Sequence, residues 1–118
     1  MQWNTFTAAG SQWVQSFTIK NGDGTLVNLT GMTWEFVIRP NVTDATVPPL
    51  VKVTTTATAQ GQIAVDIPSA TVTVTLTPAA TTLLGKGARP HALWANPGLT
   101  TATCWVEGTF NSSLVAAQ

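Results

Sequence analysis

Few side chains in this sequence can do acid–base or nucleophilic chemistry. They are one imidazole, one thiol and five carboxylates: His91, Cys104, Asp23, Asp44, Asp66, Glu35 and Glu107. A nucleophilic triad needs the histidine beside a serine and an acid, and the sequence contains no Gly-x-Ser-x-Gly segment that would display such a serine. One histidine and one cysteine also provide no zinc-ligand spacing. We therefore expect no enzyme, no metal site and no cofactor.

Two carboxylates come closest to a catalytic pair. Glu35 and Glu107 both fall on the outward phase of expected strands, and two such groups on neighbouring strands could hydrolyse a glycosidic bond. An outward glutamate on a strand is more commonly a solvated charge or one that protects a sheet edge. Cys104 lies in an apolar strand pattern, where we expect a small buried hydrophobic residue rather than a nucleophile.

The five tryptophans could build a core or a stacking platform. Trp13 and Trp34 lie in the inward phase of strong strand patterns, so we assign them to the core. Trp94 and Trp105 lie in the opposite phase of the last two strand patterns. We expect them to form an exposed aromatic pair, unless a β-bulge shifts the phase. On a surface with few charges, such a pair indicates a protein interface or a carbohydrate site.

The segment 29–39 is the strongest strand pattern in the chain. Met32, Trp34, Phe36 and Ile38 alternate with polar or smaller residues, which is typical of a half-buried antiparallel strand. Full burial of each of these side chains stabilises a fold by roughly 1.5–3 kcal/mol. Pro40 ends the pattern because proline cannot donate a hydrogen bond to the next rung of a sheet. We expect the other strands to pack over this apolar face.

Seven segments have strand patterns in all. They are residues 12–20, 29–39, 50–58, 62–67, 70–77, 90–96 and 101–110. We expect 50–58 and 62–67 to form a hairpin across Gln60-Gly61. A short helical turn is expected near 77–84, with Thr77 as N-cap, Pro78 at the first position and Gly85 as the stop. This spacing predicts an all-β fold, an antiparallel β-sandwich with immunoglobulin-like or jelly-roll topology.

A length of 118 residues fits one domain. We expect an N-terminal arm with a short strand at 1–11, the β-sandwich domain at 12–110 and a C-terminal tail at 111–118. Trp3 is expected to dock on a neighbouring subunit or on its own sheet. The residues expected to form an interface are Trp3, Phe6, Trp94, Trp105, Leu114 and Val115.

The shortage of charge is the most informative property of the composition. Only 8% of residues are charged and the net charge is zero, whereas about 25% is usual. A folded chain of this mass exposes roughly 6,000 Å², so charges are sparse on its surface. We infer that much of this surface is covered in a larger assembly; the alternative is a weakly charged soluble monomer. The five basic residues are scattered, so we expect no nucleic-acid partner.

The N-terminal residues have no basic segment followed by an apolar one, so we expect no signal peptide. No apolar run approaches the ~20 residues of a membrane-spanning helix. We therefore expect synthesis in a cytosol and no membrane partner.

The segment 28–39, which begins Asn-Leu-Thr-Gly, resembles a module found in virions of tailed bacteriophages. It is similar to the N-terminal domain of baseplate upper proteins and to small minor tail proteins, in which such a turn opens an alternating strand. Segments 17–24, 61–66 and 107–110 are similar to other strands and turns of that family. The resemblance covers about residues 12–110. No receptor-binding or fibre region follows it, so we do not expect a complete host-recognition device.

The resemblance implies a non-enzymatic structural component of the virion, made in the host cytoplasm. It would be a minor tail protein, a baseplate adaptor or a capsid decoration protein, and its partners would be other virion proteins and copies of itself. The alternative is a carbohydrate-binding β-sandwich module that stacks a glycan on Trp94 and Trp105.

Overall fold

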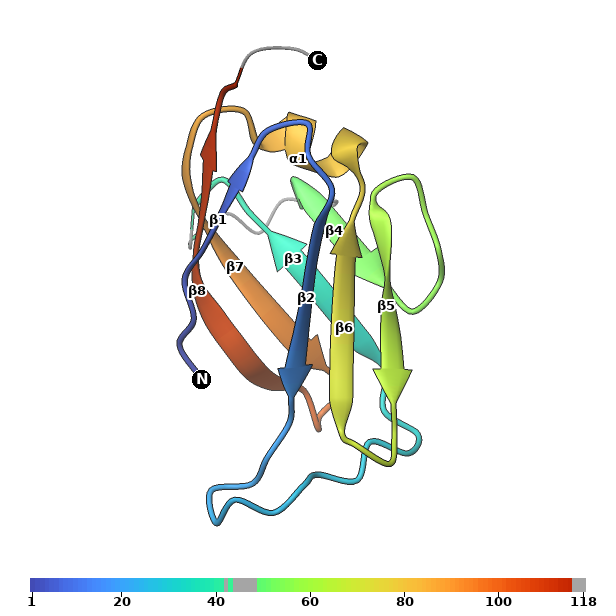
Figure 1. The fold of residues 1–118 in the computed structure, drawn as a ribbon. Helices are drawn as coiled ribbons and strands as arrows, with labels where there is room; N and C mark the ends of the chain where they lie inside the picture. Colours follow the sequence, from blue (N-terminus) through green and yellow to red (C-terminus); the bar gives the residue numbers. More distant parts are fainter. Residues whose placement is uncertain (42, 44–48, 116–118) are drawn as a thin grey trace.

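Two β-sheets face each other in this protein (Figure 1). A computed structural model describes residues 1–41, 43 and 49–115, and this part holds eight strands and one helix. The elements are β1 (Thr5–Ala8), β2 (Trp13–Thr18), β3 (Trp34–Ile38), β4 (Val51–Thr54), β5 (Gly61–Asp66), β6 (Thr71–Leu76), α1 (Pro78–Leu84), β7 (Gly87–Ala95) and β8 (Thr103–Ser113). One sheet has the order β1-β8-β7-β3-β4 and the other β2-β6-β5. The expected all-β class is confirmed.

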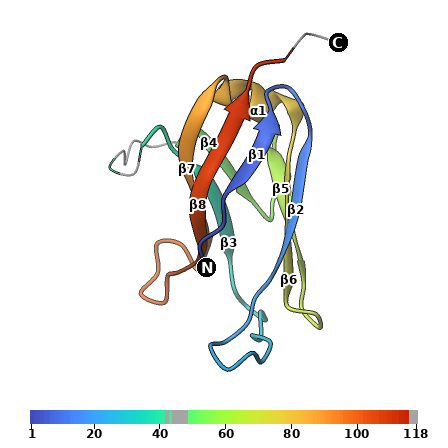
Figure 2. The same ribbon diagram turned by 60° about the vertical axis from the view of Figure 1, so that its left-hand side comes forward.

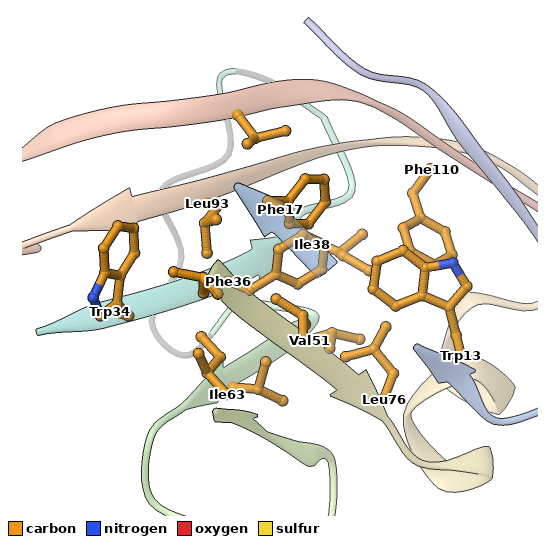
Figure 3. Close-up of a cluster of buried hydrophobic side chains, with 14 of the residues drawn as sticks. Trp13, Phe17, Trp34, Phe36, Ile38, Val51, Ile63, Leu76, Leu93 and Phe110 are labelled. Atoms are coloured by element: carbon orange, nitrogen blue, oxygen red, sulfur yellow. The ribbon is translucent and has the colours of Figure 1, made fainter. Parts of the chain in front are cut away.

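The hydrophobic core lies between the two sheets. Trp34, Phe36 and Ile38 project into it from β3, while Trp13 and Phe17 come from β2 (Figure 3). Their side chains are 7% exposed or less. The core placement of Trp13 and Trp34 is therefore confirmed, and the period-two alternation of both strands is the reason, since it sends every second side chain to one face.

The helix occupies the expected position. The Thr77 hydroxyl accepts a hydrogen bond from the Ala80 amide at 3.3 Å, and Pro78 stands in the first turn, where its missing N–H costs nothing. Gly85 follows with a φ of 57°, a conformation that favours glycine. The helix prediction for 77–84 is confirmed.

The expected hairpin between 50–58 and 62–67 is wrong. β4 pairs with β3 in the larger sheet, and β5 pairs with β6 in the smaller one. Val51 and Val53 thus enter the core from one sheet and Ile63 from the other. A hairpin would instead have placed all three on one face of one sheet. The Gln60 side chain holds the crossing, because its Oε1 accepts a hydrogen bond from the Lys52 amide at 2.9 Å.

The last strand and the N-terminal segment are joined more closely than the sequence indicated. β8 continues to Ser113, so residues 111–113, expected in the tail, belong to the sheet. β1, expected within an arm, pairs with β8 in parallel and forms the edge of the larger sheet. The ladder extends beyond both ends of β1, with hydrogen bonds from the Trp3 amide to the Glu107 carbonyl at 2.7 Å and from the Ala9 amide to the Ser113 carbonyl at 2.8 Å.

The molecule has two distinct ends along its longest dimension of 43 Å (Figures 1 and 2). At the first, which we call the helix end, lie α1, the β1–β2 turn and residues 114–115. The Thr81 hydroxyl accepts a hydrogen bond from the Gly10 amide there. At the second, the loop end, lie the β2–β3, β5–β6 and β7–β8 connections. Strand pairing places them together, since Thr18 is opposite Thr71 and Trp34 is opposite Ala95.

Candidate interaction site

The outer face of the larger sheet combines small apolar side chains with a few polar ones. On β7, His91, Leu93 and Ala95 are buried on the core side, and the residues between them face outward. Cross-strand register extends this outer face to β3 and β8. Its side chains are Ala88, Pro90, Ala92 and Trp94 on β7, Glu35 and Val37 on β3, and Cys104, Glu107 and Thr109 on β8.

A shallow hollow of about 670 Å³ lies on this face. Val37, Ala92 and Pro90 give it an apolar lining, and Val37 is only 5% exposed although it faces away from the core. Trp94 adds an indole, and Glu107 and other polar residues border the space. This volume is within the range of small-ligand sites, but the hollow is shallow and open to solvent, and several charged or polar side chains line it.

The expected exposed pair of Trp94 and Trp105 is wrong, because a β-bulge separates the two residues. Leu93 is opposite Val106, but Trp94 is opposite Cys104, which leaves Trp105 as the extra residue of the bulge. Trp105 packs against the core, and its Nε1 is buried without a hydrogen-bond partner in the described part of the chain. Trp94 alone lines the hollow, where it is partly buried.

The same bulge overturns the core placement of Cys104. The thiol is partly exposed and lies in the wall of the hollow. Burial raises the pKa of the Cys104 thiol, and the nearby Glu107 carboxylate raises it further. The thiol is therefore protonated near neutral pH, and a protonated thiol is a poor nucleophile.

The two glutamates considered as a catalytic pair do share the outer face. β7 lies between their strands, however, so Glu35 on β3 and Glu107 on β8 are not on neighbouring strands. Glu35 instead pairs with Lys52, with 3.4 Å between the carboxylate oxygen and the ammonium nitrogen. Among the described residues, no three histidine, cysteine or acidic side chains come together as metal ligands do.

His91 is buried in an aromatic cage and fastens the N-terminal segment. Its side chain is 3% exposed, and its Nε2–H donates to the Trp3 carbonyl at 2.7 Å. The rings of Trp3, Phe36 and Phe110 surround it. Burial lowers the pKa of His91, although the Trp3 carbonyl and Glu107 act in the opposite direction. The imidazole is therefore neutral, which is the form that fits a cage without a counter-ion. The sequence carried no signal for this role, because it depends on a contact between residues 88 positions apart.

Trp3 and Phe6, expected to act together in an interface, have different surroundings. The Trp3 ring packs against Phe17 with 5.1 Å between ring centroids and against Trp13 at 6.1 Å. Of the two alternatives for Trp3, docking on its own sheet is the one observed. Phe6 is 68% exposed and points away from the core.

Leu114 and Val115 follow the last strand at the helix end and are 67% and 58% exposed. The six residues expected to form an interface thus make no single surface: two pack against the core, one lines the hollow, one lies on the edge strand and two lie at the helix end. Other exposed apolar side chains were missed. They are Met1, Val14, Leu26, Ile67, Leu83 and Leu99. For Leu26, Ile67 and Leu99 the available signal was a large apolar residue within a turn-rich segment.

No protein-family model matches the chain, and no curated protein matches it. Within the described residues, no helix combines the length and apolar character needed to cross a membrane.

Proposed function

We propose that this chain is a non-enzymatic structural module of a tailed-bacteriophage virion that acts through protein–protein contacts. One observation carries the proposal: large apolar side chains project from a surface that has few charges. Nine such side chains are at least 47% exposed among the described residues, on a total surface of 6581 Å². The whole chain has only five basic and five acidic residues, so charge repulsion does little to prevent this surface from binding other proteins.

The virion assignment rests on the resemblance of four short segments to phage structural modules. Those segments lie on or beside β2, β3, β5 and β8, so they are distributed over both sheets. The resemblance therefore follows the framework of the domain rather than one local motif. A minor tail protein, a baseplate adaptor and a capsid decoration protein all fit this reasoning.

We further infer that the fold is an immunoglobulin-like β-sandwich. The order β2-β6-β5 corresponds to strands B-E-D of that architecture, and β8-β7-β3-β4 corresponds to G-F-C-C′. Trp34 on β3 is also buried where the strand C tryptophan of immunoglobulin domains lies. A jelly roll would instead divide eight strands between two Greek keys.

The test of the virion assignment is to look for the chain in purified particles. Antibodies raised against the purified chain would be applied to density-gradient-purified phage that encodes it, with negative-stain microscopy and quantitative mass spectrometry. We expect labelling at one fixed position and a constant copy number per particle. Abundant protein in the lysate together with its absence from the particles would refute a structural role in the virion.

Carbohydrate binding is a second candidate, and the hollow beside Trp94 is the observation that favours it. An indole can stack on a sugar ring, and Glu107 and Thr109 could bond its hydroxyls. The platform would be Trp94 alone, since Trp105 packs against the core. Glycan binding should change tryptophan fluorescence in the wild type and not in Trp94→Ala, with Val14→Ser as a surface control. No response to a broad glycan panel would eliminate this candidate.

A further inference from the structure

The exposed apolar side chains are concentrated at the two ends of the molecule. Six of the nine lie there, three at each end. At the helix end Leu83 is 51% exposed, Leu114 67% and Val115 58%. At the loop end the exposed residues are Leu26 at 49%, Ile67 at 47% and Leu99 at 59%.

Turn formation does not account for the apolar residues of the loop end. Polar side chains and glycines already build those turns: the Asp23 carboxylate accepts hydrogen bonds from the Thr25 amide and hydroxyl, and Gly24 has a φ of 88°. After Pro97-Gly98, the Leu99 amide donates to the Asn96 carbonyl at 3.2 Å, a bond that any residue other than proline could make. The exposed leucine side chains contribute nothing to either turn, so a contact outside the domain is the simpler explanation for them.

The two ends differ in charge. At the helix end lie two basic side chains, Lys86 and Arg89, and the Arg89 guanidinium donates to the Leu84 carbonyl at the end of α1. At the loop end lie two carboxylates, Asp23 and Asp66, together with Lys20. Both carboxylates are close in sequence to exposed apolar residues, since Asp66 precedes Ile67 and Asp23 is in the turn before Leu26. These described side chains give the helix end two positive charges, and they give the loop-end connections two negative charges against one positive charge.

We propose that copies of this chain associate head to tail, with the helix end of one copy against the loop end of the next. The proposal rests on the proposed structural function and names its partner as a second copy of the chain. In a contact between unlike ends, the leucines of the helix end pack against the leucines and isoleucine of the loop end. The same contact brings the basic side chains of the helix end near the carboxylates of the loop end. Contact between two helix ends would bring Lys86 and Arg89 of both copies together, which like-charge repulsion opposes. Such a heterologous contact leaves each added copy with one free end, so it builds rings or filaments.

Blocking one end at a time tests this arrangement. A helix-end variant would carry Leu83→Ser and Leu114→Ser, and a loop-end variant Ile67→Ser and Leu99→Ser. All four side chains are about half exposed or more, so each substitution should change the free energy of unfolding by less than about 0.5 kcal/mol. Val14→Ser is the matched control, because Val14 is 53% exposed on the outer face of β2, opposite Thr75, and belongs to neither group of end residues. Circular dichroism and urea unfolding would check that each variant is folded.

The readout is sedimentation velocity over a concentration series at low salt. We expect the wild type and Val14→Ser to grow into oligomers, and each blocked variant alone to associate at least tenfold more weakly. A one-to-one mixture of the two blocked variants should form dimers and nothing larger, since each supplies one intact end. Added salt should weaken the association.

Three results would overturn the proposal. If the loop-end variant alone dimerised as well as the wild type, the contact would join two helix ends; the same result with the helix-end variant would indicate two loop ends. If the wild type stayed monomeric at every concentration, copies would not contact one another through these ends. In that case, labelling of particles would still decide the proposed function, so the two proposals can fail separately.

Discussion

Residues 3 and 4 of the N-terminal segment pass close over Gly108 of β8. A β-carbon at this position would collide with the Trp3 carbonyl and would lie 2.8 Å from the Asn4 side-chain oxygen. Gly108→Ala should therefore push residues 1–4 off β8 and lower the free energy of unfolding by about 2–3 kcal/mol, as overpacking does. Urea denaturation measures this. Gly22→Ala is the control, because a β-carbon there meets nothing within 4 Å; equal effects of the two changes would contradict the close approach.

His91 should make stability depend on pH. Because the folded-state pKa lies below the unfolded value of about 6.5, the unfolded chain binds a proton more readily than the folded one. The stabilisation is complete above pH 6.5, falls as the pH drops below it, and levels off below the folded-state pKa. Urea midpoints measured from pH 7.5 to 5 should show this fall. His91→Gln should flatten the profile in that range, and an unchanged slope in this variant would show that another group is responsible.

Individual residues were predictable where the alternation of a strand is unbroken. Trp13 and Trp34 follow from the pattern because no irregularity interrupts β2 or β3. Cys104 and Trp105 did not, because one bulge residue reverses the phase of all residues on one side of it. Nothing in the local sequence places that bulge, since it is defined by the register between β8 and β7.

At the scale of elements, β1 and the residues before it are part of the domain rather than a free arm. Trp3→Ala should lower the free energy of unfolding by about 3 kcal/mol, at the low end for a tryptophan because the side chain is only partly buried. Phe6→Ser should change it by less than about 0.5 kcal/mol, since Phe6 is 68% exposed. Thermal or urea unfolding of both variants distinguishes them. Equal small effects would mean that the N-terminal segment is not held by Trp3.

The sequence indicated β2 to β8 by their strand patterns and a short strand in the N-terminal segment, but it did not indicate how the strands pair. β4 and β5 are close in sequence and rich in β-branched residues, and a hairpin was the simplest interpretation. Both strands have a buried apolar face, and that pattern is identical whether they share a sheet or face each other across the core. β4 and β5 each have another neighbour in the sequence, β3 and β6 respectively, and they pair with these instead of with each other. The alternation alone does not choose between the two neighbours, so local patterns could not determine the pairing.

For the whole molecule, the sparse charge was evident from composition. Nine large apolar side chains are exposed among the described residues. Their positions were not evident. Leu26, Ile67 and Leu99 are separated by more than 30 residues from one another and lie toward the same end only because strand pairing places three connections there. The two-ended distribution of apolar groups and charge is therefore a property of the fold, and the proposed head-to-tail contact depends on it.

The central claim, that this chain works by association with other proteins of its assembly and with its own copies, is tested most directly by the mass of the purified wild-type chain in solution. Sedimentation equilibrium over a concentration series would measure it against the 12.4 kDa of one chain. We expect the weight-average mass to rise steadily with concentration and to fall back on addition of salt. A mass that stays at 12.4 kDa up to millimolar concentration would contradict self-association through these surfaces.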